Sequence, residues 1–138
     1  MDNSVVVVTG GSGGIGQALV KKYLKEGCFV ISVDLEKTTD FEDRNLSFLQ
    51  CNVECEKSIN NLFDFVLKKY KKIDYFFSNA GVLSLGDENS SNFDWEKNWK
   101  LHLMSHVFVS RKLLPIFKKQ NFGYLLITAS AAGLLTHI

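Results

Sequence analysis

The sequence predicts an α/β fold, a doubly wound parallel sheet with helices on both faces. Short apolar runs alternate with helical patterns along the chain. The first run, residues 5–8, is four valines, which is typical of a buried parallel strand. Five glycines then fall within seven positions, residues 10–16, and a helical pattern follows directly. A strand, a glycine turn and a helix in this order indicate the first unit of such a sheet.

Five strands and three helices are predicted in alternation. The predicted strands are residues 5–8, 28–33, 46–51, 73–77 and 123–130. Helical periodicity is found over residues 14–26, 56–72 and 93–120, and the polar loops are residues 35–45 and 82–92. Because crossovers between parallel strands are right-handed, this alternation predicts a sheet with the Rossmann-type strand order 3-2-1-4-5.

The predicted helix 93–120 is apolar on more than one face, through residues such as Trp95, Leu101 and Phe108. A helix of this kind needs burial on more than one side, so we predict a homo-oligomer that forms through it. Pro115 lies inside this helix. We expect it to kink the helix or help end it, because proline lacks the N–H that a helix interior uses.

The composition of the chain excludes several classes of partner. Its 138 residues suit one dinucleotide-binding domain, residues 1–138, with a sizeable core. The net charge of +1 provides no broad field for nucleic acid or an anionic membrane. No run approaches the length of about 18 apolar residues that spans a bilayer, and Asp2 stands where a secretory signal would be basic. We therefore expect a cytoplasmic protein.

The cysteines and histidines do not predict a metal site. An odd number of cysteines without an export signal fits reduced thiols, and Cys28 and Cys51 lie in apolar strand candidates, where they fit as core residues. Cys51 and Cys55 are four positions apart with no second pair. His102 and His106 have the helical i, i+4 spacing, but no third ligand is in view. We expect no bound metal.

The glycine turn carries the first functional signal. Gly11, Gly13 and Gly16 fit GxGxxG, the general dinucleotide fingerprint, and the narrower TGxxxGxG begins at Thr9. The following helix directs its free N–H groups at whatever lies over the turn, and a pyrophosphate is the expected occupant. The alternative is a flexible glycine turn with no ligand. Asp34, at the end of the second strand, favours the dinucleotide, because a carboxylate there can bind the adenosine ribose hydroxyls.

The glycine turn and Asp34 are followed by NAG at 79–81 and ITASAAG at 127–133. With these motifs in this order, the sequence resembles the short-chain dehydrogenases/reductases over essentially the whole chain. The resemblance implies that the glycine turn binds the pyrophosphate through Gly10, Ser12, Gly13, Ile15 and Gly16. The other implied contacts are the adenosine ribose at Asp34, adenine at Asn52 and Val53, and the central cleft at Asn79, Ala80 and Gly81. Asn52 departs mildly from the aspartate that is usual in the family.

For catalysis, the resemblance implies that Ser130 helps to polarise the substrate carbonyl. The family's asparagine in the long helix, seven residues after a tryptophan, is replaced by His102 when counted from Trp95. A histidine can still relay a proton through water. The family's acid/base tyrosine, in the pattern YxxxK about a dozen residues after the serine, falls beyond Ile138, and no tyrosine of the chain has a lysine four residues on. We expect an N-terminal fragment that lacks the C-terminal part of the fold.

The leading hypothesis is an NAD(H)-dependent oxidoreductase that moves a hydride between a nicotinamide and a small-molecule alcohol or carbonyl substrate. Asp34 favours NAD over NADP, because a carboxylate repels a 2′-phosphate unless the positive charge of Lys37 or Arg44 intervenes. The first alternative is a noncatalytic nucleotide-binding or regulatory module, which His102 and the missing YxxxK would favour. The second is an epimerase or dehydratase relative, which the glycine spacing disfavours. The sequence does not identify the substrate.

Overall fold

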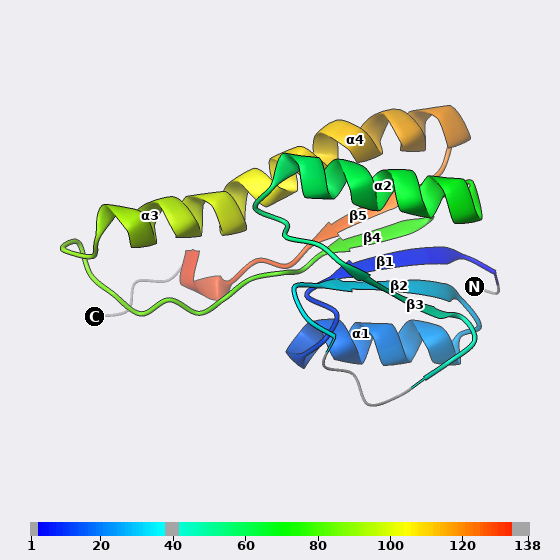
Figure 1. Cartoon of the computed structure of the whole chain (residues 1–138), viewed down its shortest axis with the longest axis horizontal. Helices are drawn as coiled ribbons and strands as arrows, with labels where there is room; N and C mark the ends of the chain where they lie inside the picture. Colours follow the sequence, from blue (N-terminus) through cyan, green and yellow to red (C-terminus); the bar gives the residue numbers. More distant parts are fainter. Residues whose placement is uncertain (1–2, 38–41, 134–138) are drawn as a thin grey trace.

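The computed structural model, described here for residues 3–37 and 42–133, contains one five-stranded parallel sheet (Figure 1). Its order, β3-β2-β1-β4-β5, confirms the predicted doubly wound topology. Every pair of neighbouring strands is parallel. The strands are β1 (Val5–Thr9), β2 (Phe29–Asp34), β3 (Leu46–Gln50), β4 (Tyr75–Ser78) and β5 (Tyr124–Ile127).

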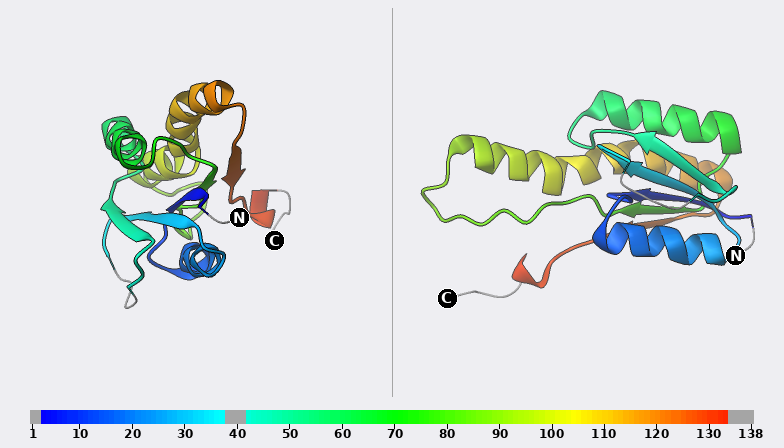
Figure 2. Two further views of the ribbon diagram at one scale, coloured as in Figure 1. Left: turned by 90° about the vertical axis from the view of Figure 1, so that its right-hand side faces the viewer. Right: turned by 60° about the horizontal axis from the view of Figure 1, so that its bottom comes forward.

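Helices cover both faces of this sheet. The α-helices are α1 (Gly14–Lys25), α2 (Glu56–Tyr70), α3 (Asn92–Trp99) and α4 (Ser105–Gln120). Two short segments, the π-helical η1 (Lys100–Met104) and the 3₁₀ turn η2 (Ala131–Gly133), complete the order. Helix α1 lies on one face, and α2 and α4 lie on the other (Figure 2). The loop after β4 and helix α3 extend beyond the end of the sheet (Figure 1).

The central strand β1 divides the core into two clusters, and all five of its residues are buried. Val5 and Val7 belong to the cluster with α2 and α4, where the rings of Phe63 and Phe76 stack with centroids 5.6 Å apart. The alternate valines of β1 face α1. Since successive side chains of a strand point to opposite faces, a strand with helices on both sides must be apolar throughout. This explains the unbroken run of valines.

The prediction of a single helix over residues 93–120 was wrong in one respect. The π-helical turn η1 separates α3 from α4, and a π-turn inserts an extra residue into the helical repeat. Pro115 does not end the helix, since α4 continues to Gln120. The left-handed conformation of Asn121, with φ 53°, ends it instead.

Several smaller predictions can also be checked. Cys28 and Cys51 are buried, as predicted for core residues, whereas Cys55 is exposed at the start of α2. No helix among residues 3–37 and 42–133 is long and apolar enough to cross a membrane. Residues 38–41 of the predicted loop 35–45 lie outside the described residues.

Candidate functional site

A cleft of about 1270 Å³ lies at the carboxyl ends of the strands. Its walls come from the turn after β1, the ends of β2 and β4, the segment after β3, and the residues that follow β5. In the order 3-2-1-4-5, β1 is the point at which the chain switches from one side of the sheet to the other. Ligands of doubly wound sheets bind outside the carboxyl ends of the strands at this point.

The glycine turn forms one wall of the cleft and depends on its glycines. Gly10 and Gly14 have φ values of +68° and +50°, which side chains rarely adopt. A Cβ at Gly16 would overlap the carbonyl of Gly10. The helix and the turn can therefore approach this closely only because residue 16 has no side chain. A Cβ at Gly13 would meet nothing within 4 Å, because this residue faces open space. The turn is therefore tightly packed on the inside and accessible from the cleft.

Helix α1 begins at the open side of this turn. Its N-cap residue, Gly13, has no side chain, and the first turn of the helix contains no acidic residue. The N–H groups of a first helical turn have no partner within the helix and carry a partial positive charge. Gly13, Gly14 and the 64% exposed Ile15 line the cleft. An anion such as a pyrophosphate fits this position.

Asp34 lies at the end of β2 and lines the same cleft. Its Oδ2 accepts a hydrogen bond from the Ser12 backbone N–H at 3.0 Å, and its Oδ1 accepts one from Leu35 at 2.8 Å. The hydroxyl of Ser12 donates to the Glu36 carbonyl at 2.7 Å. These bonds fix the carboxylate beside the glycine turn. Each carboxylate oxygen has a second lone pair with which to accept a bond from a ribose hydroxyl.

Two of the predicted pyrophosphate residues have internal positions. Ser12 is 7% exposed and, like Gly16, does not line the cleft. The structure places Ser12 between Asp34 and the chain after β2, and Gly16 against Gly10. Both support the shape of the turn, and direct ligand contact by either remains a prediction.

The end of β4 forms the centre of the cleft. Asn79, Ala80 and Gly81 all line it. The Thr9 hydroxyl accepts bonds from the backbone N–H groups of Asn79 at 2.9 Å and Ala80 at 3.1 Å. The Asn79 side chain donates to the Thr9 carbonyl at 3.1 Å and accepts from the Thr128 hydroxyl at 2.8 Å. Asn79 therefore links the ends of β1, β4 and β5.

Asn52 and Val53 lie at the other end of the cleft, after β3. Val53 is buried and Asn52 is exposed. The side-chain oxygen of Asn52 accepts a bond from the Glu54 N–H at 2.9 Å, and its backbone carbonyl accepts one from Cys55 at 3.1 Å. Both acceptors shape the turn that holds Val53 against the core. This arrangement is compatible with the predicted adenine contact, which stays a prediction.

The predicted catalytic residues also line the cleft. Ser130 is exposed and precedes η2, whose Gly133 N–H donates to the Ser130 carbonyl at 3.1 Å. His102, in η1, is exposed, and a Cβ on Gly81 would lie 3.1 Å from its Cε1. The structure thus brings Ser130 and His102 to the same cavity as Gly81. π-turns are frequent at functional sites.

Sequence reasoning missed three side chains of the site. Thr9 was noted only as the start of a motif, although its hydroxyl organises the turn after β4. Thr128 and His106 were assigned no role at the cleft, and both contact the end of β4. The threonine at the head of TGxxxGxG was the available signal for Thr9. The sequence offers no signal for Thr128 and His106, because their role depends on their proximity to the end of β4 in the folded chain.

Comparison with known proteins agrees with this geometry. The family model for the short chain dehydrogenases matches residues 4–138. The chain is 34% identical to short-chain dehydrogenase reductase 3a of Arabidopsis thaliana, covering 96% of this chain and 55% of that protein. It is 29% identical to the peroxisomal hydratase-dehydrogenase-epimerase of Neurospora crassa, covering 96% of this chain and 17% of that protein. The chain thus spans about half, or less, of the length of these relatives.

A solved structure gives the same result for the fold. A short chain dehydrogenase/reductase from Burkholderia phymatum, in complex with NAD, superposes with a TM-score of 0.93 at 28% identity. The match covers 99% of this chain and 52% of that one. Members of this family are oxidoreductases that bind a nicotinamide cofactor. On the family match, the sheet order and the cleft, this chain belongs to the short-chain dehydrogenases.

Proposed function

We propose that residues 1–138 form the dinucleotide-binding domain of an NAD(H)-dependent oxidoreductase. The observation that carries this proposal is the cleft itself, in which an open glycine turn, the start of α1 and the Asp34 carboxylate converge. A solved relative that is 28% identical binds NAD. When bound, a nicotinamide dinucleotide supplies the hydride acceptor or donor.

The chain's own residues divide the binding task. The N–H groups at the start of α1 neutralise the pyrophosphate, and Gly13, at which a Cβ would meet nothing within 4 Å, leaves room for it. The Asp34 carboxylate accepts bonds from the adenosine ribose. Val53 offers an apolar contact for adenine. The turn at 79–81, fixed by Thr9, leaves the nicotinamide end of the cleft open to a substrate.

Asp34 leads us to propose NAD rather than NADP. One carboxylate charge about 4 Å from one phosphate charge repels it by about 4 kcal/mol at an effective dielectric near 20. Gly13 and Leu35, which line the cleft beside Asp34, offer no positive charge to offset this repulsion. We therefore expect the site to prefer a 2′-hydroxyl to a 2′-phosphate, unless Lys37 or Arg44 offsets the repulsion.

Titration of the protein with NADH and NADPH tests the proposal. We expect NADH to bind at least tenfold more tightly, since about 1.4 kcal/mol is a factor of ten. Asp34→Asn is expected to reduce or reverse this preference. Asp64→Asn, an identical charge change on the exposed face of α2, is the matched control and should leave it unchanged. Tighter binding of NADPH by the unaltered protein would refute the NAD assignment.

For the reaction, we propose hydride exchange with a small alcohol or carbonyl compound, with Ser130 polarising the carbonyl and His102 relaying a proton. Both residues line the cleft beside the turn at 79–81. The acid/base tyrosine of the family would follow Ser130 by about 13 residues. The coding sequence that follows the codon of Ile138 tests this proposal. A YxxxK motif there supports the oxidoreductase, and a stop codon directly after Ile138 refutes it.

A second candidate is a noncatalytic nucleotide-binding module, which the replacement of the family's asparagine by His102 favours. Both candidates bind NADH, so binding alone does not separate them. Turnover of NADH by the full-length protein over a panel of aldehydes and ketones does so. Turnover that falls at least tenfold in Ser130→Ala identifies an enzyme, and binding without turnover identifies the module.

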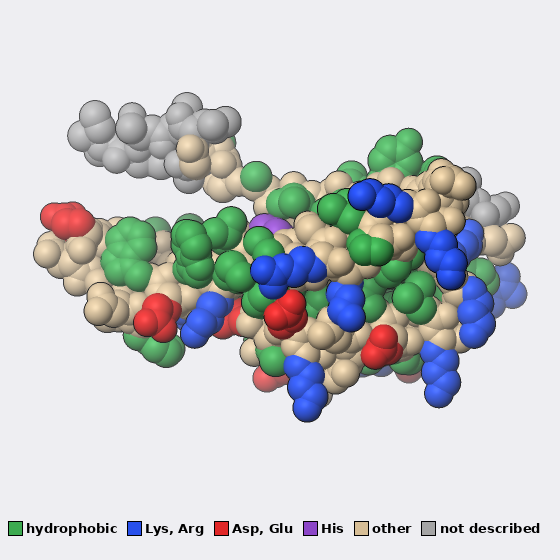
Figure 3. Space-filling model, turned by 90° about the horizontal axis from the view of Figure 1, so that it is seen from above, with side chains coloured by type: hydrophobic (Ala, Val, Ile, Leu, Met, Phe, Trp, Pro, Cys, Tyr) green, Lys and Arg blue, Asp and Glu red, His purple; other side chains and the backbone are tan. Residues whose placement is uncertain are grey.

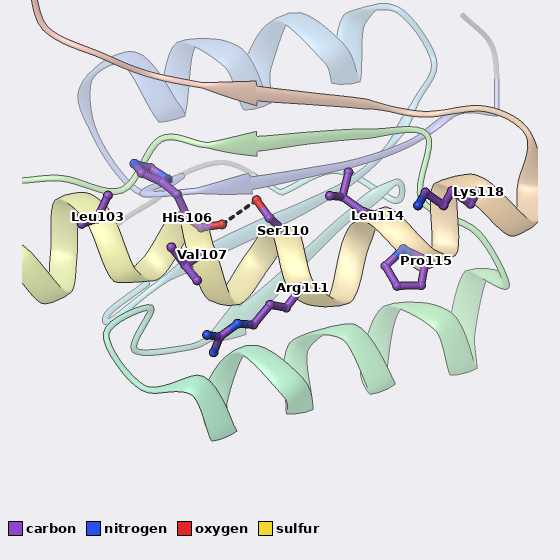
Figure 4. A pocket seen from close by; sticks show the side chains of 8 residues that line it. All are labelled: Leu103, His106, Val107, Ser110, Arg111, Leu114, Pro115 and Lys118. Carbon is purple, nitrogen blue, oxygen red and sulfur yellow. Dashed lines mark hydrogen bonds between the residues drawn. The ribbon is translucent and has the colours of Figure 1, made fainter.

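We propose a homo-oligomer that forms through α4. A groove of about 480 Å³ runs along the end of η1 and α4, and it is lined by apolar Leu103, Val107, Leu114 and Pro115 and by basic Arg111 and Lys118 (Figure 4). The preceding segment carries the acidic residues Asp87, Glu88, Asp94 and Glu96. An antiparallel pair of copies would place this acidic segment of each over the basic helix of the other.

The mass of the protein in solution tests this proposal. Leu114→Asp, which places a charge in the groove, should yield monomers. Leu83→Asp, at an 87% exposed loop residue outside the groove, should not. A monomeric unaltered protein at the highest soluble concentration would refute the oligomer.

We propose that the protein acts in the cytoplasm. The near-neutral charge and the reduced state expected of its three cysteines support this location. Because relatives include peroxisomal enzymes, the alternative is the peroxisome. Imaging of the full-length protein with an internal tag distinguishes the two compartments, and a signal confined to peroxisomes would overturn the proposal.

A further inference from the structure

Two histidines lie on the cleft side of the helix that runs through η1 into α4. Both His102 and His106 line the cleft. His102 is exposed and its ring rests against Gly81. His106 is half-buried, and its Nδ1 lies 2.6 Å from the hydroxyl of Ser78. Figure 4 shows the His106 ring directed from α4 toward the strands. The two side chains therefore have different surroundings and are expected to have different roles.

The hydrogen bond between His106 and Ser78 matters because of where Ser78 lies in the sheet. It is the last residue of β4, is 3% exposed, and accepts a bond from the Thr128 N–H through its carbonyl. The next residue, Asn79, is the side chain that links three strands at the cleft. The hydrogen bond between His106 and Ser78 therefore attaches the start of α4 to the end of β4, next to the residue that links three strands.

Geometry also connects His106 to His102. The two residues are four positions apart, one in η1 and one in α4, and α4 follows η1 without a break. A π-turn has a wider ring of hydrogen bonds than an α-helix, so its side chains are placed by tertiary contacts as well as by the helix. The His106–Ser78 bond is such a contact, two residues past the end of η1.

We propose that His106 is a positioning residue: its hydrogen bond to Ser78 fixes η1, and with it His102, against the turn at 79–81. This inference rests on the proposed function, since His102 and that turn belong to the proposed site. It assigns His106 no contact with the substrate. It predicts that the bond through Nδ1, rather than the volume of the ring, is what matters.

The charge states agree with this division of roles. Burial lowers the pKa of His106, and the neighbouring His102 lowers it further. The neutral form of His106 is therefore favoured, and a neutral imidazole can hold one tautomer against the Ser78 hydroxyl. Other chargeable groups line the two cavities beside His106: Asp34, Glu54 and Lys97 in the cleft, and Arg111 and Lys118 in the groove.

A pair of variants isolates the hydrogen bond. Asparagine places its side-chain nitrogen where His106 has Nδ1, whereas glutamine places its nitrogen near the position of Nε2. His106→Asn should therefore keep the bond to Ser78, and His106→Gln should lose it. Ser78→Ala removes the bond from the other side. Ser110→Ala, which loses only a bond to the His106 carbonyl within the same helix, is the control.

The first measurement is the imidazole ¹⁵N and ¹H NMR spectrum of the full chain between pH 5 and 8. We expect one fixed tautomer for His106 in the unaltered protein and in Ser110→Ala. In Ser78→Ala, the two His106 tautomers should mix, and the His102 resonances should shift. An unchanged His106 tautomer and unchanged His102 resonances in Ser78→Ala would overturn the inference, whether or not the protein binds a nucleotide.

The second measurement is the dissociation constant for NADH, with the thermal midpoint recorded to show that each variant is folded. His106→Gln and Ser78→Ala should weaken binding about 3- to 10-fold, the range expected for one hydrogen bond. His106→Asn should stay within about twofold of the unaltered protein. Equal affinities for the asparagine and glutamine variants would overturn the inference. Absence of NADH binding by the unaltered protein would instead refute the proposed function and leave the NMR result to decide.

Discussion

The segments before residue 79 and those after it differ in how far their apolar side chains are buried. Every residue of β1 is buried, and α2 buries a full face of four apolar residues. By contrast, α3 has no buried residue, and in β5 Ile127 is 49% exposed. Figure 3 shows several exposed hydrophobic side chains on the projecting part of the molecule that contains α3. The part that contains the glycine turn and Asp34 therefore buries most of its apolar side chains, whereas the second part presents apolar surface to solvent.

The largest expected difference between the two parts comes from phenylalanine truncation. Phe63, in α2, is 2% exposed, and Phe93, in α3, is 73% exposed. Phe63→Ala should lower the free energy of unfolding by about 3 to 5 kcal/mol, because it leaves a cavity in the core. Phe93→Ala should change it by less than about 0.5 kcal/mol. Urea denaturation measures both, and similar losses would contradict the comparison.

The next effect concerns the glycine turn in the first part. A Cβ at Gly16 would overlap backbone atoms of Gly10, so Gly16→Ala should cost about 2 to 3 kcal/mol and abolish NADH binding. Gly13→Ala is the matched control for stability, since Gly13 has an extended φ of −151° and an open surrounding. It should cost less than about 1 kcal/mol, the range of a changed helix cap. NADH titration and denaturation of both variants check this.

A smaller effect is expected where the two parts meet. Thr9→Val removes the acceptor of two backbone N–H groups at the end of β4 and should cost about 1 to 3 kcal/mol. Thr128→Val, at an exposed residue with one bond to Asn79, should cost less than about 1 kcal/mol. If the two variants are equally unstable, Thr9 is not the organiser of this turn.

The smallest effect is the pH dependence that Cys51 contributes. Burial raises its pKa from 9.0 to about 11, so the folded state holds the thiol proton more tightly than the unfolded state does. This contribution to stability is complete below pH 9 and is lost as the pH rises toward 11. No change is therefore expected between pH 7 and 8. Denaturation at pH 8 and pH 10 checks the sign, with Cys51→Ala expected to lose less stability over this interval.

Much of the fold was predictable because it depends on local patterns. The alternation of apolar runs, the stripe on α2 and the glycine turn each specify an element without knowledge of the rest. The break at η1 was not predictable, since residues 100–104 contain no glycine or proline to mark it. Its position depends on contacts made in space, such as that of His102 with Gly81.

The candidate site shows the same division. Asp34 and the NAG turn were located from motifs, because their chemistry requires particular residue types at a fixed place after a strand. The bond from the Asn79 N–H to the Thr9 hydroxyl joins residues 70 positions apart, and the bond between His106 and Ser78 joins residues 28 positions apart. Such pairings follow from the strand order, so they become visible only when the sheet is assembled.

The position of β1 at the middle of the sheet affects how the protein is made. Of the five strands of this sheet, β1 is synthesised first, yet its two neighbours are β2 and β4, and the second of these ends only at Ser78. Until then, the valine run lacks one of its partners, and short unpaired runs of this kind are prone to intermolecular association. Newly synthesised copies therefore need protection during translation, and a delay before Ser78 emerges should increase the fraction that aggregates.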